Sequence, residues 1–422
     1  MDATSEATLL RNVHVVETER EGLRRDQQVL IENGVITRVS ADAGETSAHR
    51  AVVDCGGGFL IPGLVDMHVH LGQAKEDLRL YLNNGVTTVR NMWGIEGFGL
   101  RRWLLGTRVF RHLELKREIA SGVTLGPDIV TAGPIFEGEP AAFPSFMLEP
   151  ITTEREAREE VVRQKTAGYD LIKIYEGLSK PVFLAIMRTA RDLGIPVGGH
   201  TPYSVGLAAC VREGLHTNEH LHGVIFPLRP ELNPSLEQRE KLIDLLVEKQ
   251  TWVCPTLIGW ERLGNAKDEA RFQQEADYLA MPSRVQRGMR LLNRMACKKA
   301  EQSSLAPYPC HLETLKAIVQ RLNRQGARLL AGTDTSLPYV SPGYALIREI
   351  HHLHDAGLSA FEALRCATYN AALCLGLSDQ IGSIREGARA DLVLLKENPL
   401  ADLKALQERA WVMKRGRRLG TA

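Results

Sequence analysis

Both ends of the chain carry short apolar runs, some alternating with polar residues, that predict β-strands. Near the N-terminus these runs cover residues 8–16, 28–31, 35–39 and 51–54. Asn33-Gly34, between the second and third runs, is a strong hairpin signal, and the glycines at 56–58 are expected to end the fourth run. Near the C-terminus, residues 390–395 and 411–413 show the same pattern, and residues 414–418 predict a solvated basic turn. Two β-rich ends therefore flank a middle segment of a different kind.

The middle of the chain, from Leu64 to Leu377, repeats a unit in which an amphipathic helix ends at a glycine and a short apolar strand follows. Thr153 and Glu156 have the spacing of a capping box at the start of one such helix. The eight predicted strands cover residues 64–67, 86–89, 128–131, 171–175, 195–197, 215–220, 251–254 and 329–331. Short apolar strands that alternate with helices are typical of a buried parallel sheet, and eight units match an α/β fold of the (β/α)8 TIM barrel type.

The alternative architecture is a doubly wound open sheet. No G-x-G-x-x-G or G-x-x-x-x-G-K-[ST] pattern stands at any predicted strand-to-helix turn, so the phosphate-binding signature of many open sheets is missing and the barrel is preferred. Two segments, near residues 93–126 and 259–310, are longer than ordinary loops and have helical, charged patterns. We expect these insertions to serve as lids or subunit contacts.

The amino-acid composition restricts the possible functions of the protein more than it restricts its possible folds. The 422 residues are 44% hydrophobic and carry 52 Lys+Arg against 51 Asp+Glu, a formal net charge of +1. Such a balance favours a small-molecule substrate over a nucleic acid or an anionic membrane. The 7 cysteines show no C-x-x-C spacing, and the chain shows neither a signal peptide at its start nor an apolar run of about 18 residues. We therefore expect a cytoplasmic protein with reduced cysteines.

Polar side chains at the ends of the predicted strands are the candidates for chemistry, because such ends meet at one mouth of a barrel. They are His68, His70, Lys173, His200, His220 and Asp334. His68 and His70 are two residues apart on a strand and so share a face. Imidazole and carboxylate ligands in this number suit Zn²⁺ or a similar divalent ion, and they exceed the needs of one tetrahedral ion. The lysine fits a two-metal site if its amine loses its proton and takes up CO2 to form a carbamate.

These residues resemble the amidohydrolase superfamily, and within it the branch of prolidase-like and imidazolonepropionase-like enzymes. The resemblance rests on residues 61–70 (IPGLVDMHVH), Lys173, His200, Glu219-His220 and residues 331–335 (AGTDT). It continues through residues 363–368 and 382–393 and so covers nearly the whole chain. The resemblance implies a barrel at 64–379, a β-sandwich domain built from residues 1–63 and 380–422 together, and a homo-oligomer.

The resemblance also implies a binuclear centre with two divalent ions, which we expect to be zinc. In that family pattern His68, His70 and Asp334 hold the more buried ion, His200 and His220 hold the more exposed ion, and carboxylated Lys173 (N6-carboxylysine) bridges them. A metal-bridging hydroxide then attacks the scissile amide carbon. Asp334 is the expected catalytic residue, because it can move a proton from the nucleophile to the leaving nitrogen.

For the substrate, the same branch implies a dipeptide of the Xaa-Pro kind or an N-acyl or aryl-amide amino acid, such as an ochratoxin-like compound. A substrate carboxylate needs a cation or hydroxyl groups at the barrel mouth. The candidates are Tyr175, Tyr203, His222, Arg229 and Arg90.

Three alternatives compete with this interpretation. A mononuclear cyclic-amide hydrolase or a deaminase on the same fold typically lacks the lysine ligand, and deaminases often carry a glutamate three residues after the fifth-strand histidine, where this chain has Tyr203. A serine hydrolase is disfavoured because residues 202–206 (PYSVG) have proline at the first glycine of the nucleophile elbow. A non-catalytic scaffold is disfavoured because all six ligand positions are filled.

Overall fold

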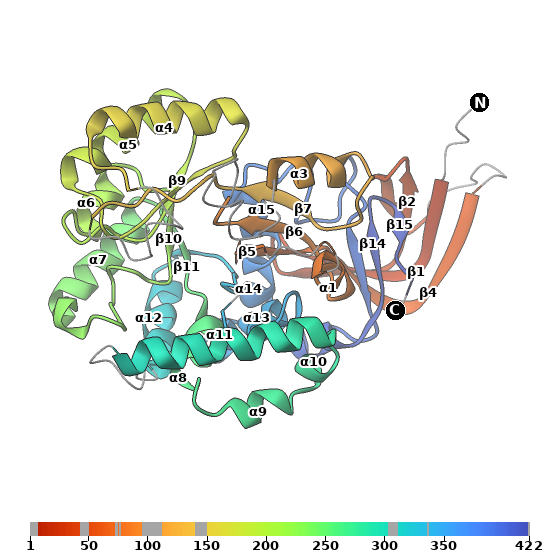
Figure 1. Cartoon of the computed structure of the whole chain (residues 1–422). Helices are drawn as coiled ribbons and strands as arrows, with labels where there is room; N and C mark the ends of the chain where they lie inside the picture. The colour runs from red at the N-terminus through yellow and green to blue at the C-terminus, as the bar shows by residue number, and fades with distance from the viewer. Residues whose placement is uncertain are drawn as a thin grey trace.

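The computed structural model describes residues 7–42, 50–71, 75, 77–94, 112–139, 150–302, 311–335 and 337–420. Within these residues the chain forms one mixed sheet built from its two ends and two parallel sheets flanked by helices in its middle (Figure 1). The predicted α/β class is confirmed. Each of the eight middle segments predicted to be strands overlaps a strand, although the overlap with β9 and with β12 is a single residue, Val197 and Leu329.

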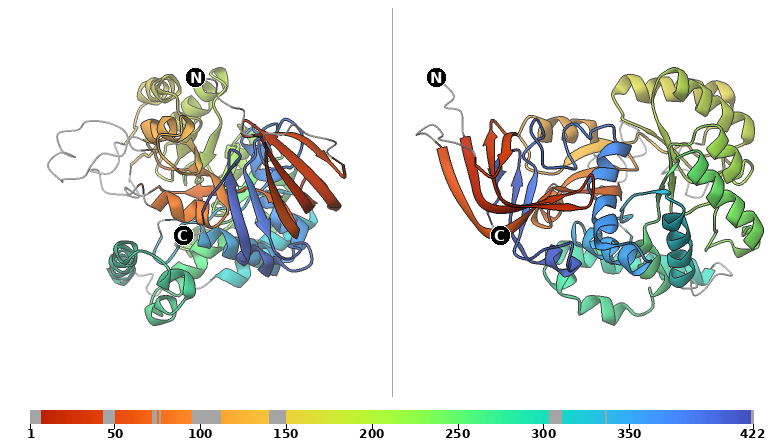
Figure 2. Two further views of the ribbon diagram at one scale, coloured as in Figure 1. Left: turned by 90° about the vertical axis from the view of Figure 1, so that its right-hand side faces the viewer. Right: turned by 180° about the vertical axis from the view of Figure 1, so that it is seen from behind.

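The mixed sheet has seven strands in the order β15-β14-β13-β4-β1-β2-β3. Its strands are β1 (Ala7–Glu17), β2 (Gly22–Glu32), β3 (Val35–Ser40), β4 (Arg50–Pro62), β13 (Leu392–Leu395), β14 (Arg409–Lys414) and β15 (Arg417–Arg418). β4 pairs in parallel with β1 and antiparallel with β13, so it joins the N-terminal strands to the C-terminal ones. Figure 2 shows this sheet at one end of the molecule.

Two details of this sheet differ from the expectations. β4 continues through the three glycines instead of ending before them, because Gly56 and Gly57 take positive φ values and the register against β1 shifts by a bulge at that point. The basic turn after β14 is not wholly solvated. Lys414 is buried, and its ammonium group lies 2.8 Å from carboxylate oxygens of both Asp128 and Asp391.

The eight strands of the middle segment are short and mostly buried. The three-stranded sheet contains β5 (Leu64–Val69), β6 (Val86–Asn91) and β7 (Asp128–Thr131). The five-stranded sheet runs in the order β12-β11-β10-β9-β8 and contains β8 (Ile172–Ile174), β9 (Val197–Gly199), β10 (Thr217–Glu219), β11 (Trp252–Cys254) and β12 (Arg328–Leu329). All of the pairings within these two sheets are parallel.

Backbone hydrogen bonds link the two parallel sheets along both of their outer edges. Next to β7, Ala132 forms a parallel bridge with Leu171, which immediately precedes β8. Next to β5, the backbone N–H of Met67 donates to the carbonyl of Ala331, just after β12, at 3.0 Å. The carboxyl ends of all eight strands therefore point toward a common region.

Helices follow the strands and cover them on the outside (Figure 1). They are α1 (Asp77–Asn83), α3 (His112–Ala120), α4 (Glu154–Ala167), α5 (Lys180–Asp192), α6 (Leu207–Arg212), α7 (Leu236–Glu248), α12 (Leu312–Arg324), α13 (Tyr344–Asp355), α14 (Ala360–Cys366) and α15 (Tyr369–Cys374). The predicted capping box of α4 is present, since Thr153 and Glu156 each bond the other's backbone N–H. The apolar faces of these helices and the strands form one large hydrophobic core.

The described parts of the two predicted insertions are helical. The first contains α3, while residues 95–111 lie outside the described residues. The second contains α8 (Leu257–Gly264), α9 (Glu269–Gln273), α10 (Ala276–Leu279) and α11 (Ser283–Gln302), and residues 303–310 lie outside the described residues. No helix in the described ranges combines the length and apolar character needed to span a bilayer.

Candidate active site

The structure brings the side chains at the strand ends into one cluster. Ring centroids lie 4.4 Å apart for His68 and His220, 4.9 Å for His200 and His220, and 5.3 Å for His68 and His70. These residues reach the cluster from β5 and from the loops that directly follow β5, β9 and β10. The fold therefore gathers histidines that are up to 152 positions apart in sequence (68 to 220).

The backbone around the cluster is held in conformations that non-glycine residues rarely adopt. His220 and Asp334 have φ values of 61° and 58°. The backbone N–H of Asp334 donates to the carbonyl of His68 at 2.8 Å. The Asp66 carboxylate accepts bonds from the backbone N–H groups of His68 and Thr333, tying the end of β5 to the residue before Asp334. Strained conformations of this kind persist only where surrounding contacts enforce them, and they concentrate at functional sites.

His68 is oriented by a buried carboxylate. Its Nδ1 lies 2.7 Å from an oxygen of Glu219, so Nδ1 carries the proton that it donates and Nε2 is left with a free lone pair. Glu219 in turn accepts a bond from the Arg90 guanidinium at 2.8 Å. Burial raises the pKa of Glu219, but Arg90 and His68 outweigh burial and hold it well below its usual range. Burial, followed by repulsion from Lys173, lowers the pKa of His68 to about 4, so the ring is neutral near pH 7.

Asp334 is the carboxylate at the centre of the cluster. One of its oxygens lies 3.0 Å from His70 Nε2 and 3.4 Å from His68 Nε2. Burial raises its pKa, and the nearby His220 and His70 rings lower it by more, so the carboxylate stays ionised. The ligand atoms of His68, His70 and Asp334 all lie within 4.8 Å of one another, a spacing that one metal ion can bridge.

Lys173 is an amine without a hydrogen-bond partner among the described residues. It lies in the middle of β8, is fully buried, and its Nζ accepts and donates no bond there. Burial lowers the pKa of Lys173 to about 8, although attraction to Glu219 and Asp334 opposes this effect. A buried ammonium without a partner is costly, whereas a neutral amine or a modified amine is not.

His200 and His220 complete the cluster on the side of β9 and β10. His220 Nδ1 lies 2.7 Å from the Thr256 hydroxyl. Burial, followed by repulsion from Lys173, lowers the pKa of His200 to about 3, and burial holds the pKa of His220 well below its usual range. Both rings are therefore neutral at pH 7, the form that binds metal ions.

Glu176, two residues beyond the end of β8, is a hub that the sequence interpretation did not include. One of its oxygens lies 2.9 Å from His200 Nδ1 and 3.0 Å from His222 Nε2. Its other oxygen accepts a hydrogen bond of 2.5 Å from the Tyr203 hydroxyl. Burial alone would raise the pKa of Glu176, but the bonds from His200 and His222 hold it well below its usual range.

The predicted substrate-binding residues have different environments. Tyr175 is half-buried with its ring stacked on His200 at 3.9 Å, and Tyr203 is 39% exposed with the Arg229 guanidinium 5.5 Å from its ring. His222 lies in the loop after β10 instead of on the strand, yet it contacts Glu176. The prediction that Arg90 can bind a substrate carboxylate at the mouth is wrong. It is buried beneath the site and donates to Glu219 and to the carbonyl of Met67, so it cannot reach a substrate at the mouth.

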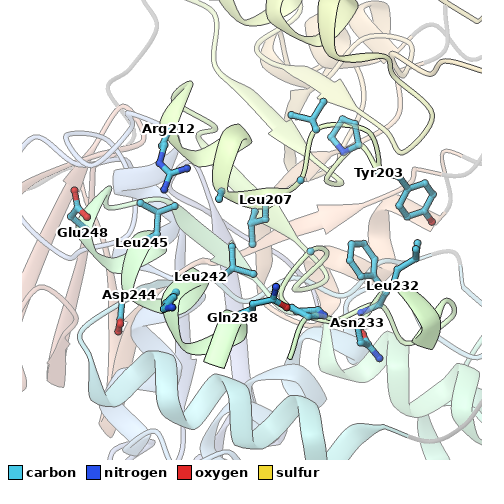
Figure 3. Close-up of a pocket in the computed structure, with 18 residues that line it drawn as sticks. Tyr203, Leu207, Arg212, Leu232, Asn233, Gln238, Leu242, Asp244, Leu245 and Glu248 are labelled. Carbon is cyan, nitrogen blue, oxygen red and sulfur yellow. Dashed lines mark hydrogen bonds between the residues drawn. The ribbon is translucent and has the colours of Figure 1, made fainter. Parts of the chain in front are cut away.

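A groove of about 810 Å³ begins beside this mouth and runs between α6 and α7 (Figure 3). Tyr203 lies at one end of the groove and Glu248 lies toward the other. Its floor is apolar where Leu207, Leu242 and Leu245 line it. Phe226 lines the groove and also contacts the His222 ring edge-on at 4.8 Å, so the groove is continuous with the residues around Glu176.

The sequence interpretation assigned no role to two residues of the site, Glu176 and Glu219. Glu219 ends β10 and Glu176 lies just past β8, so both satisfy the same positional rule as the predicted ligands. In the sequence, the signal that could have identified them is an acidic residue within a few positions of a predicted histidine or lysine ligand. Carboxylates commonly orient metal-binding histidines in this way.

The donor set fits divalent metal ions. His68 Nε2 and Lys173 Nζ are buried and have no hydrogen-bond partner among the described residues, which is the state expected of atoms that await a further ligand. Neutral imidazoles and an ionised carboxylate surround them. Nitrogen and oxygen donors of this kind suit zinc and related first-row ions.

Curated relatives match different shares of the chain. Dihydroorotase of Halalkalibacterium halodurans is 39% identical over 93 residues (20% of this chain, 21% of the relative). Adenine deaminase of Ruegeria sp. (strain TM1040) is 22% identical over 413 residues (94% and 55%). Ochratoxinase of Aspergillus niger is 37% identical over 87 residues (20% and 17%). The chain thus spans less than two thirds of the length of each of these relatives.

Solved structures match almost the whole chain. A putative prolidase from Bifidobacterium longum has a TM-score of 0.73 and 24% identity, covering 98% of this chain and 94% of that one. Bottromycin amidohydrolase has a TM-score of 0.75 and 25% identity, covering 98% and 87%. The family model described as the amidohydrolase family matches residues 59–419. The protein belongs to the amidohydrolase family.

Proposed function

We propose that this protein is a metal-dependent hydrolase that cleaves an amide C–N bond of a small molecule. The observation that carries the proposal is Lys173, a fully buried amine without a hydrogen-bond partner among the described residues. Its charge interacts with Asp334 and with three of the predicted histidine ligands, His68, His200 and His220. A carbamate on this amine supplies two oxygens and a negative charge, which matches a position between two cations.

The fold that supports this site is proposed to be a closed (β/α)8 barrel at 64–379 with a β-sandwich domain from 1–63 and 380–422. The hydrogen bonds that link both edges of the parallel sheets support the barrel. The pairing of β4 with β1 and β13 supports a domain shared by the two ends of the chain. A homo-oligomeric state and a cytoplasmic location stay predictions.

The proposed metal ligands are those expected from the sequence. His68, His70 and Asp334 hold the more buried ion, and their ligand atoms already lie within 4.8 Å of one another. His200 and His220 would hold the second ion, and Lys173, once carboxylated, would supply oxygen ligands to both. Zinc is the proposed metal because the set is rich in imidazole.

The chain's own residues account for the proton transfers of amide hydrolysis. When bound, the ions lower the pKa of water and polarise the scissile carbonyl. Asp334, ionised and central in the cluster, accepts the proton of the attacking water and passes it to the leaving nitrogen, which departs poorly as an anion. His68 and His200 stay neutral near pH 7 and so do not compete for that proton.

The proposed substrates are dipeptides of the Xaa-Pro kind and N-acyl or aryl-amide amino acids, including ochratoxin-like compounds. Tyr203, His222 and Arg229 flank the mouth and are proposed to bind the substrate, with Tyr175 contacting it from beside His200. The apolar groove next to Tyr203 supports a substrate with an apolar arm.

The test is metal content per chain, measured by elemental analysis on protein prepared without chelators. The wild type is expected to hold two equivalents and Lys173→Ala one or fewer. Lys165→Ala removes an exposed lysine on α4 and serves as the matched control. Hydrolysis of dipeptides and N-acyl amino acids should disappear in Lys173→Ala and persist in the control.

One equivalent in both proteins would overturn the binuclear proposal. It would favour the alternative, a mononuclear cyclic-amide hydrolase or a deaminase on the same fold, and the substrate screen would move to those compounds. Mass spectrometry of the intact chain under native conditions gives a second readout, because a carbamate adds the mass of one CO2.

A further inference from the structure

We infer that Glu349, in α13, is a positioning residue for the metal site, because it holds the start of α8 and with it the Thr256 side chain that contacts the His220 ring. The inference deepens the proposed function and rests on it, since its consequence is a loss of metal affinity. Neither Glu349 nor Thr256 is one of the six proposed ligands.

Thr256 gives its hydroxyl to a ligand ring instead of to its own helix. It occupies the N-cap position of α8, but its side chain makes no capping bond there. The hydroxyl lies 2.7 Å from His220 Nδ1, and Thr256 is buried. The other ring nitrogen of His220 is left for a metal ion. An N-cap threonine ordinarily accepts a bond from an N–H group in the first turn, so at α8 this task falls to another residue.

That residue is Glu349, whose side chain is fully buried. One of its oxygens accepts the backbone N–H of Leu257 at 3.0 Å, and the other accepts the backbone N–H of Ile258 at 2.8 Å. Both N–H groups belong to the first turn of α8 and have no acceptor within the helix. Burial raises the pKa of Glu349 to about 8 against these two bonds, and a carboxyl group can accept N–H bonds whether or not it is ionised. Glu349 therefore caps α8 from another helix.

The backbone at Thr256 is held in a conformation that threonine rarely adopts. Its φ is 51° and its ψ is 48°, in the left-handed region, which is costly for a β-branched side chain. Such a conformation persists only where surrounding contacts enforce it. On the side of β11, the carbonyl of Cys254 accepts the backbone N–H of His220 at 2.8 Å. On the side of α8, Glu349 holds the next two N–H groups. The bonds to Glu349 thus fix the conformation that directs the Thr256 hydroxyl to His220.

A cap that stabilises only the helix is the competing interpretation, because α8 also packs against α13 and its loosening would lower stability without affecting the site. Variants that differ from the wild type by few atoms separate the two interpretations. Glu349→Gln fills the same space, but its NH2 group cannot accept an N–H bond. Thr256→Val keeps the β-branched shape and loses the hydroxyl, whereas Thr256→Ser keeps the hydroxyl.

The first measurement is the affinity of the full chain for Zn²⁺ alone, by chelator competition. Thr256→Val and Glu349→Gln should each lose about 10-fold to 100-fold in affinity for one of two ions, the usual effect of removing a group that orients a ligand. Thr256→Ser should keep the affinity of the wild type. An unchanged affinity in Glu349→Gln or in Thr256→Val would overturn the inference.

The double variant Thr256→Val/Glu349→Gln decides whether Glu349 acts through Thr256. If it does, the double variant should lose no more affinity than the more impaired single variant, because both changes remove the same constraint on His220. Losses that multiply would show that Glu349 acts independently of Thr256 and would contradict the positioning role. Glu349→Asp takes the place of Glu349→Gln if the latter does not fold, since it keeps a carboxyl group and shortens its reach.

Ser359→Ala is the matched control for a lost cap. The hydroxyl of Ser359, an exposed residue, accepts the backbone N–H of Glu362 at the start of α14. The control should lower the midpoint of urea unfolding and leave the Zn²⁺ affinity unchanged.

The same set of single and double variants, unfolded in urea without metal, separates this inference from the proposed function. The midpoint shifts of Thr256→Val and Glu349→Gln should not add in the double variant. Shifts that add would refute the coupling of Glu349 to Thr256, whatever the metal content. If the wild type binds no Zn²⁺, the proposed function fails, and the consequence for metal affinity fails with it.

Discussion

Asp334 shows how much a single residue depends on its surroundings. Its carboxylate lies among His68, His70 and His220, and its backbone is held at φ 58° by a bond from its own N–H to the His68 carbonyl. The side chain would serve both as a ligand and as the group that moves a proton. These two roles can be separated, because an amide still offers an oxygen but cannot act as a base.

Asp334→Asn is therefore expected to keep the fold and most of the metal while lowering kcat at least about 100-fold, the size of a general acid–base contribution. Steady-state kinetics and elemental analysis on the same preparation measure both effects. Asp192→Asn, an exposed carboxylate at the end of α5, is the control and should behave as wild type. Substantial residual turnover in Asp334→Asn would exclude the proton-transfer role.

At the scale of elements, the close approach of β8 and β9 sets the distance between Lys173 and His200. Gly199, the last residue of β9, has φ 142°, and a Cβ atom there would lie 2.2 Å from the backbone oxygen of Ile174. Only glycine allows the two strands to pair this closely. The strand ends that carry Lys173 and His200 depend on that pairing.

Gly199→Ala is expected to lower the free energy of unfolding by about 2–3 kcal/mol, because the overlap forces β8 and β9 apart. It should also reduce metal content. Gly194→Ala is the matched control: its φ is 61° but a Cβ atom there meets nothing within 4 Å, so the cost should be about 1 kcal/mol with full metal content. Urea unfolding measures the free energy of unfolding, and elemental analysis measures the metal content. Equal effects in the two variants would contradict the role assigned to Gly199.

At the scale of the whole molecule, a charged cluster joins the mixed sheet to the parallel strands. Asp128, the first residue of β7, lies 2.8 Å from Lys414, Arg389 and Arg415. Burial raises the pKa of Asp128, but Lys414 and Arg389 outweigh burial and hold it below its usual 3.8. A carboxylate with a lowered folded pKa stabilises the protein above the pKa of the unfolded state, and that stability is lost as the pH falls through the folded pKa.

Asp128→Asn is expected to cost about 3 kcal/mol near pH 7, because it leaves the buried Lys414 and the half-buried Arg389 without one of their partners. The difference from wild type should stay constant down to about pH 5 and shrink at lower pH. Urea unfolding at several pH values measures it. Glu159→Gln, which breaks an exposed pair on α4, should cost under about 0.5 kcal/mol at every pH. A pH-independent loss in Asp128→Asn would rule out the charge interaction as its cause.

The sequence by itself determined the strand order along the chain, the helix boundaries at glycines and capping residues, and the position of the six candidate ligands in or just after strands, because each depends on local patterns of two to four positions. The family membership followed from the same local motifs and is confirmed.

Tertiary structure alone decided which charged groups meet. Arg90 was expected at the mouth, but β6 points it inward against Glu219, and Lys414 was expected in water but lies between Asp128 and Asp391. Glu176 became a hub because the loops after β8, β9 and β10 converge on it. A local sequence pattern cannot predict such contacts, because the burial of a side chain and its partners depend on residues far apart in the chain. These contacts decide whether an ionisable side chain is a surface charge or part of the site.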